Sequence, residues 1–177
     1  MTERTLVIIK SDGVERRLVG EIIKRFEQIG LTLKGMKMLK SDEDLIERHY
    51  TMDPEWLRIT GEKSIKNSKE KGHPLLSEVP EEAGRIVLNT LKAYLTKGPA
   101  IAMIWSGPHA VAVVRKLVGS TEPLSSDVGT IRGDFVLDSY ELSNREGRAI
   151  RNLVHASSSI KEAEAEIAHW FSKSDIL

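Results

Sequence analysis

Apolar residues fall along the chain in two patterns: short continuous runs, and longer stretches in which they recur at helical spacing. The short runs are typical of buried strands: Thr5–Ile9, Pro99–Trp105 and Leu153–His155. A further strand is predicted over Leu31–Leu39, where apolar residues alternate with polar ones but with a slip in the alternation. The longer stretches are typical of amphipathic helices: Leu18–Ile29, Gly107–Val118 and Ile160–Phe171. In chain order, and without the charged middle of the sequence, these elements predict an α+β fold. The expected architecture is a ferredoxin-like βαββαβ sandwich, an antiparallel four-stranded sheet with helices.

Two segments interrupt this pattern, and we interpret them as insertions in a single domain that spans residues 1–177. The first, residues 53–97, is rich in charge and contains helical patterns near 54–71 and from about 80 to 96. The second covers residues 137–149. The first insertion therefore predicts a helical addition to the sandwich.

Two local signals complete the expected organisation. Ser41 and Asp44 predict the start of a short helix that runs to Tyr50. Residues 119–129 form a long segment rich in Ser, Thr, Pro and Asp, which is typical of a loop. Loops of this length within compact domains are often functional.

Composition narrows the functional classes. The chain has 26 basic and 26 acidic residues, a formal net charge of +0, so bulk charge gives no reason to expect a nucleic-acid partner. The count of zero cysteines excludes disulfides, thiolate metal ligands and catalytic cysteines. The first apolar run ends at Lys10, too early for a signal peptide, and no apolar stretch reaches membrane-spanning length. We therefore expect a cytosolic protein that binds neither nucleic acid nor membrane.

His155 is the first candidate for chemistry. It ends an apolar run, and three hydroxyl residues, Ser157–Ser159, separate it from the last helical pattern. Ser159 and Glu162 have the spacing of a capping box, which predicts a helix N-terminus just after the histidine. Free N–H groups and the helix dipole favour phosphate there, so His155 is a candidate nucleophile toward a phosphoryl group. The competing interpretation is a histidine that is hydrogen-bonded at a strand end, which is commoner for an isolated histidine.

Phosphate chemistry also requires positive charge around the anion. The sequence has neither a Walker A pattern nor a Gly-x-Gly-x-x-Gly turn. Basic residues occupy four suggestive positions instead: Lys10, Arg115, Arg132 and Arg151. Lys10 ends a buried strand and is expected to point into a cleft above the sheet, while a guanidinium at position 115 or 132 can engage two phosphate oxygens. Taken singly, each of the four is more typical of a solvated surface charge.

Five blocks, in order along nearly the whole chain, resemble the nucleoside diphosphate kinase family. They are Ile8-Ile9-Lys10-Ser11-Asp12-Gly13-Val14, His49-Tyr50, Gly119-Ser120-Thr121-Glu122-Pro123, Gly129-Thr130-Ile131-Arg132-Gly133-Asp134-Phe135 and Asn152-Leu153-Val154-His155-Ala156-Ser157. The last block is close to the family's Asn-x-x-His-Gly-Ser. The two insertions are the parts of the chain that the resemblance does not cover.

The resemblance implies a ping-pong reaction. A nucleoside triphosphate, with ATP as the expected donor, gives its γ-phosphoryl group to His155, and a nucleoside diphosphate takes it from there. His155, Lys10 and Glu166 would be catalytic, with Glu166 orienting the imidazole directly or through Ser157. The implied nucleotide-binding residues are Lys10, Tyr50, Arg115, Thr121, Arg132 and Asn152. Mg²⁺ would bridge phosphate oxygens with few protein ligands, and the family implies a homo-oligomer, a hexamer or tetramer built from dimers.

The chain departs from the family pattern at several positions. Ser11 replaces a proline, which is expected to loosen the turn after Lys10. Ala156 replaces a glycine, which is harmless unless that residue needs a positive φ. Ser158 replaces an aspartate and is expected to cap the last helix about as well. The long segment after Tyr50 displaces the family's base-stacking aromatic residue, for which Trp56 is our candidate.

Two other functions are compatible with this fold. One is a non-catalytic nucleotide-binding or regulatory module, since fold alone does not establish activity. The presence of the nucleophile together with its charged partners argues against a decayed site. The other is an RNA-binding ferredoxin-like domain, which needs aromatic residues on its strands and a basic face. Aromatic residues make up only 5% of this chain and its net charge is zero.

Overall fold

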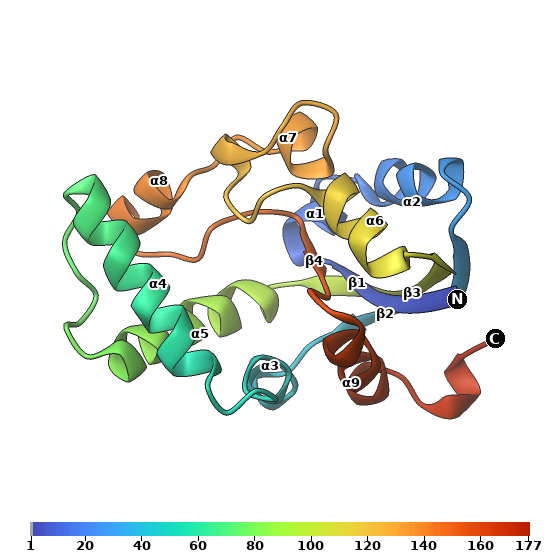
Figure 1. The fold of residues 1–177 in the computed structure, drawn as a ribbon, viewed down its shortest axis with the longest axis horizontal. Coiled ribbons are helices and arrows are strands. Elements are labelled where there is room, and N and C mark those ends of the chain that lie inside the picture. Colours follow the sequence, from blue (N-terminus) through green and yellow to red (C-terminus); the bar gives the residue numbers. More distant parts are fainter. Residues whose placement is uncertain (1) are drawn as a thin grey trace.

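The computed structural model describes residues 2–177. At its centre lies a four-stranded antiparallel sheet in the order β2-β3-β1-β4, which confirms the ferredoxin-like α+β fold (Figure 1). The strands are β1 Thr2–Ile9, β2 Thr32–Lys40, β3 Pro99–Pro108 and β4 Val154–Ala156. The helices are α1 Ser11–Glu15, α2 Val19–Gln28, α3 Glu43–Tyr50, α4 Trp56–Lys71, α5 Pro80–Leu95, α6 Ala110–Val118, α7 Ile131–Phe135, α8 Tyr140–Arg145 and α9 Ile160–Trp170. Two 3₁₀ turns are η1 Pro123–Ser125 and η2 Lys173–Asp175.

Helices cover both faces of the two central strands (Figure 1). Val7 and Ile9 of β1 face a core shared with α2 and α6, whereas Leu6 and Ile8 face a second core shared with α3 and α9. Because alternate residues are buried on opposite sides, β1 is apolar without interruption. This double cover also removes the open aromatic sheet surface that the RNA-binding alternative requires.

Strand β2 contains the irregularity that its sequence predicts. Its register against β3 shifts between Leu33 and Gly35, which is a β-bulge. The slip in the alternation of apolar residues therefore has a structural cause in the ladder itself.

The first insertion forms a helical hairpin, α4–α5, that extends away from the sheet (Figure 1). The two helices cross at Gly61 and Gly84. A Cβ atom on Gly61 would lie 1.7 Å from the carbonyl oxygen of Pro80, and one on Gly84 would lie 2.0 Å from that of Leu57. Both crossing points therefore require glycine, because only glycine lets the backbones approach so closely. The two helices predicted in this segment are confirmed.

Two predicted helix starts are wrong by a few residues. Helix α3 is capped by Asp42 rather than Ser41, because the Asp42 carboxylate accepts a hydrogen bond from the Leu45 amide at 2.7 Å. Helix α6 starts at Ala110 rather than Gly107, because Gly107 still pairs with β1. Among residues 2–177, no helix has the length and apolar composition needed to cross a membrane.

Candidate functional site

A cleft of about 1010 Å³ lies between the end of the sheet and the α4–α5 hairpin. All the site residues predicted from the sequence line it: Lys10, Tyr50, Trp56, Arg115, Thr121, Arg132, Asn152, His155 and Glu166. The side chain of Arg151 is exposed instead. Residues that lie far apart in the sequence thus meet in one place, in a space at the upper end of the usual range for ligand pockets.

His155 is held at the mouth of this cleft by β4. The strand pairs His155 with Ile8 of β1, and the imidazole keeps 17% of its surface exposed. Its Nε2 lies 2.7 Å from Oε1 of Glu166, and the other carboxylate oxygen accepts a hydrogen bond of 2.5 Å from the Ser157 hydroxyl. A carboxylate only accepts hydrogen bonds, so Nε2 carries the proton and Nδ1 is left as the free base. Glu166 therefore contacts the imidazole directly, which is the first of the two arrangements expected from the sequence. Ser157 orients the carboxylate and does not stand between it and the imidazole.

His49 belongs to the same cluster, although its chemistry was not anticipated from the sequence. It is 5% exposed, and its ring centroid lies 4.5 Å from that of His155. The indole N–H of Trp170 donates to His49 Nδ1 at 3.1 Å, so the proton of the neutral ring sits on Nε2, 3.5 Å from Glu166. Burial, followed by the neighbouring His155, His169 and Lys10, lowers the pKa of His49 well below its ordinary value. The block His49-Tyr50 was the available signal, but we assigned a role only to its tyrosine.

The cluster has the composition of a candidate transition-metal site. The potential ligand atoms of His49, His155 and Glu166 all lie within 4.8 Å of one another, and two imidazoles with one carboxylate are a known zinc donor set. However, metal binding through Nε2 of His49 would move its proton to Nδ1, where it would face the Trp170 N–H donor. The hydrogen bonds therefore favour an orienting network over a metal site.

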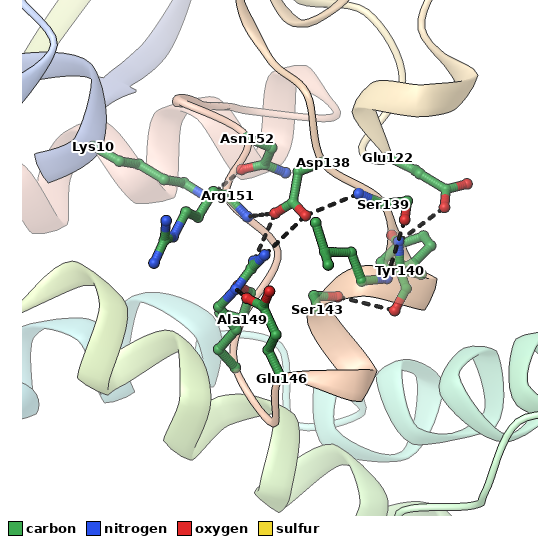
Figure 2. A network of polar contacts seen from close by, with 12 residues as sticks. Lys10, Glu122, Asp138, Ser139, Tyr140, Ser143, Glu146, Ala149, Arg151 and Asn152 are labelled. Atoms are coloured by element: carbon green, nitrogen blue, oxygen red, sulfur yellow. Dashed lines mark hydrogen bonds and ion pairs between the residues drawn. The ribbon is translucent and has the colours of Figure 1, made fainter.

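Lys10 is a buried cation of the same cleft. It leaves the end of β1, is 4% exposed and donates from Nζ to Oδ1 of Asn152 at 2.7 Å. Asn152 in turn donates from Nδ2 to the Thr121 carbonyl oxygen at 2.9 Å, which links the three predicted binding residues (the first two are labelled in Figure 2). Burial, followed by repulsion from Arg132, lowers the pKa of Lys10 from 10.5 to about 7, while Asp12 acts in the opposite direction.

The two arginines differ in how free they are to bind a ligand. Arg132 is 3% exposed, and four of its N–H groups donate to the backbone carbonyls of Gly119, Ser120, Asn152 and Val154. Since a guanidinium has five N–H groups, only one is left, and the expected two-pronged phosphate contact is not available in this arrangement. Burial, followed by the charge of Arg115, lowers the pKa of Arg132 to about 10. Arg115 is exposed and makes one long contact of 3.4 Å to the Ala156 carbonyl.

Tyr50 and Trp56 form an aromatic wall beside the histidine. Their ring centroids are 5.1 Å apart, and that of Tyr50 lies 6.4 Å from that of His155. Burial, followed by the charge of Glu166, raises the pKa of Tyr50 above its ordinary value. The hydroxyl of Tyr50 is therefore neutral and available as a hydrogen-bond donor, while stacking of a base on Trp56 stays a prediction.

The chain just before His155 is tightly bent. Leu153 has a left-handed φ of 62°, and the Val154 amide donates to the Asn152 carbonyl at 2.7 Å, which closes a γ-turn. The strand expected from Leu153 therefore begins at Val154. Backbone strain of this kind costs on the order of 1–3 kcal/mol and is typical of functional sites. Here the turn lies between Asn152, whose side chain contacts Lys10, and His155.

The three departures from the family pattern have structural explanations. Ser11 starts α1, and its hydroxyl donates to the Tyr94 carbonyl at 3.2 Å, a contact that proline could not make. Ala156 lies in β4 without a positive φ, so the change from glycine is harmless. The cap of α9 is Ser159, which accepts from the Glu162 amide at 3.1 Å. Ser158 instead donates from its amide to the Glu162 carboxylate, so its expected role as the cap is wrong.

Comparisons with known proteins point to one family. The model of the family described as nucleoside diphosphate kinase matches residues 3–56 and 52–176. A nucleoside diphosphate kinase of Pyrobaculum aerophilum is 48% identical over 99% of this chain and 98% of its own length. Nucleoside diphosphate kinase A of Mus musculus is 38% identical over 99% of this chain and 90% of its own length.

Solved structures agree with this result. The crystal structure of an NDP kinase from Pyrobaculum aerophilum superposes with a TM-score of 0.96, at 45% identity and with both chains fully covered. A nucleoside diphosphate kinase from Borrelia burgdorferi, described as a transition state mimic with bound vanadate and ADP, superposes with a TM-score of 0.81 at 35% identity. That match covers 99% of this chain and 90% of the Borrelia chain.

Proposed function

The chain belongs to the nucleoside diphosphate kinase family and transfers phosphoryl groups between nucleotides; we propose that every transfer passes through Nδ1 of His155. The observation that carries this proposal is the hydrogen bond between His155 Nε2 and Glu166, 2.7 Å long, which leaves Nδ1 as a free base in the cleft. Of the functions that fit the fold, this one uses the nucleophile and its cationic neighbours together.

The first half-reaction takes the γ-phosphoryl group from a nucleoside triphosphate, with ATP as the expected donor. The lone pair of Nδ1 forms the P–N bond while the bond from the γ-phosphorus to the β–γ bridging oxygen breaks. The nucleoside diphosphate leaves with that electron pair. In the second half-reaction, a terminal oxygen of another nucleoside diphosphate attacks the phosphohistidine and restores the lone pair of Nδ1.

Glu166 compensates the charge that develops on the imidazole during each transfer. As the P–N bond forms, the ring becomes positive, and the carboxylate that accepts from Nε2–H stabilises this form. The hydrogen bond from Ser157 and the approach of His49 keep Glu166 in place before the reaction. We therefore assign Glu166 to catalysis and His49 to positioning.

The cations at the same end of the cleft stabilise the phosphoryl group in transit. Lys10 and Arg115 have donors free to reach it, and Arg132 contributes its charge and a single N–H group. Tyr50 and Thr121 complete the proposed phosphate contacts, and Asn152 is placed to contact the sugar and phosphate region through its remaining N–H.

We propose Mg²⁺ as the divalent ion of the reaction, carried into the cleft by the nucleotide. The carboxylates that line the described cleft are Asp53, Glu162 and Glu166, and each already accepts hydrogen bonds from the protein. This donor set fits an ion held by phosphate oxygens, which is how Mg²⁺ usually binds beside nucleotides. When bound, Mg²⁺ would supply positive charge to the phosphate oxygens, in addition to the charges of Lys10 and Arg115.

We also propose that the protein is a homo-oligomer, a hexamer or tetramer built from dimers. Exposed apolar side chains support this: Leu124, Val128 and Leu137 are 76%, 93% and 100% exposed, and Met36 and Met38 on edge strand β2 are 53% and 60% exposed. Apolar surfaces of this kind are typical of protein contacts. The cytosolic location expected from the sequence stays a prediction.

Labelling with γ-³²P ATP tests the proposed route. The wild-type protein should acquire a label that is lost in acid and kept in base, as a phosphohistidine is, and ADP should remove it. His155→Ala should acquire no label, whereas His109→Gln, at the exposed N-cap position of α6, should behave as wild type. A label on the His155→Ala protein, or a label that survives acid, would overturn the assignment of the nucleophile.

A further inference from the structure

Asp138, at the start of the second insertion, has an unusually complete set of donors. It is 7% exposed. The two terminal nitrogens of Arg148 donate to its two oxygens at 2.7 and 3.0 Å, and the amides of Ser139 and Arg151 donate at 2.9 and 2.7 Å (Figure 2). Four donors fill the acceptor positions of a carboxylate. Although burial alone would raise the pKa of Asp138, the Arg148 guanidinium and these amides hold it below its ordinary value.

The Asp138 carboxylate joins the two ends of the second insertion, and through Arg151 it is connected to Asn152 in the cleft. Arg151, whose amide it holds, is followed by Asn152, whose side chain accepts from Lys10 and donates to the Thr121 carbonyl. One peptide bond therefore separates the Asp138 contact from the residue that joins Lys10 to Thr121.

A second path returns from Thr121 to the insertion. The next residue, Glu122, is 8% exposed, and its carboxylate accepts from the Tyr140 amide at 2.9 Å and from Lys71 of α4 at 3.3 Å. Tyr140 follows Ser139, which is held by Asp138. The hydrogen bonds and peptide bonds thus close a ring that runs Asp138, Arg151-Asn152, Thr121-Glu122, Tyr140-Ser139 and back to Asp138. Figure 2 labels every member of this ring except Thr121.

A closed ring restrains its members more than a chain of the same bonds would, because no link can rotate without straining another. Asn152 and Thr121 are the members that face the proposed phosphate position, and Lys10 is attached to the ring through Asn152. The rest of the ring lies in the insertion and the 119–129 loop.

We propose that Asp138 is a positioning residue, which sets Asn152 and Thr121, and with them Lys10, in place before a nucleotide binds. This rests on the proposed function, in which these three residues contact the nucleotide. The second insertion is then part of the catalytic apparatus of this chain rather than a passive surface loop. If Asp138 only held the insertion against the rest of the protein, its replacement would lower stability and leave the kinetics of phosphoryl transfer unchanged.

Asp138→Ala tests the proposal, with Glu146→Gln as the matched control. Glu146 pairs with Nε of the same Arg148 on its exposed side and lies outside the ring. Asp138→Ala should lower kcat/KM for nucleoside diphosphate by at least tenfold, which corresponds to about 1.4 kcal/mol. Glu146→Gln should stay within twofold of wild type. Labelling of His155 by ATP continues in both variants if the proposed function holds, so failure of this inference is distinguishable from failure of that function.

A double-mutant cycle separates positioning from a general loss of stability. In an Asn152→Ala background, Asp138→Ala should cause little further loss, because the residue through which it acts is gone. Additive effects, or wild-type kinetics in Asp138→Ala with a lowered melting temperature, would overturn the proposal. If Asp138→Ala does not fold, Asp138→Asn replaces it in the same cycle. Asparagine keeps one acceptor oxygen and loses the charge, and we expect at least a threefold loss that disappears when Asn152 is also replaced.

Discussion

Lys10→Met should change the stability of the nucleotide-free protein in a way that depends on pH. Burial and the nearby Arg132 lower the pKa of Lys10 from 10.5 to about 7. Between these values the unfolded chain binds one more proton than the folded chain, so wild-type stability rises with pH across this window. The cost of the buried ammonium is fully present below pH 7 and is relieved as the pH approaches 10.5. Methionine keeps the apolar stem and binds no proton, so the variant lacks this dependence.

The magnitude follows from the same window. Each pH unit within it changes the free energy of unfolding by about 1.4 kcal/mol, so the stability of the variant relative to wild type should fall by about 2 kcal/mol between pH 7 and pH 9. Loss of the Lys10 hydrogen bond leaves the Asn152 oxygen unpaired and costs about 1–3 kcal/mol. That penalty does not depend on pH, and it cancels when the two pH values are compared.

Urea unfolding at pH 7, 8 and 9, without nucleotide and at one protein concentration, measures this difference. Lys24→Met is the control, since it removes an exposed ammonium of α2 that water solvates in both states. The control should leave the pH dependence of stability unchanged. A difference between Lys10→Met and wild type that is constant from pH 7 to 9 would refute the reasoning, because it would mean that the buried ammonium carries no desolvation cost. Phosphoryl transfer should be lost in the same variant.

Three further predictions concern the cleft. Arg115→Ala and Arg132→Ala should each lower kcat/KM at least tenfold. Only Arg132→Ala should also lower the free energy of unfolding, by on the order of 3 kcal/mol, because it leaves buried carbonyls without donors. Equal stability of the two variants in urea unfolding would contradict this prediction. Glu166→Gln should slow phosphorylation of His155 at least tenfold in single-turnover labelling, with little change in nucleotide affinity, since it removes charge but keeps an acceptor; an unchanged rate would exclude charge compensation. Replacing Gly61–Glu81 of the hairpin with a short turn should raise the KM for nucleotide more than it lowers kcat, if the hairpin acts as a lid over the base and sugar. If sedimentation instead shows loss of assembly while nucleotide affinity is unchanged, the segment serves oligomer contacts.

Local sequence determined the elements of this fold because their signals need no distant partner. The apolar runs specify which strands are buried on both sides, and Ser159 specifies where α9 begins. The same locality explains the errors: Gly107 looks like the start of a helix until β1 is present to pair with it. His155, Lys10 and Arg132 were also predictable, because the blocks that carry them are short and contiguous, and these residues line one cleft in the structure.

Tertiary structure alone decided which atoms of those residues are free to act. The tautomer of His155 depends on Glu166, 11 residues away, and the role of His49 depends on Trp170, 121 residues away. Nothing near Arg132 in the sequence shows that backbone carbonyls occupy four of its N–H groups. Asp138 likewise lies in a segment outside every recognisable block. Hydrogen bonding is directional and acts over about 3 Å, so its pattern is set only when the folded chain brings these atoms together.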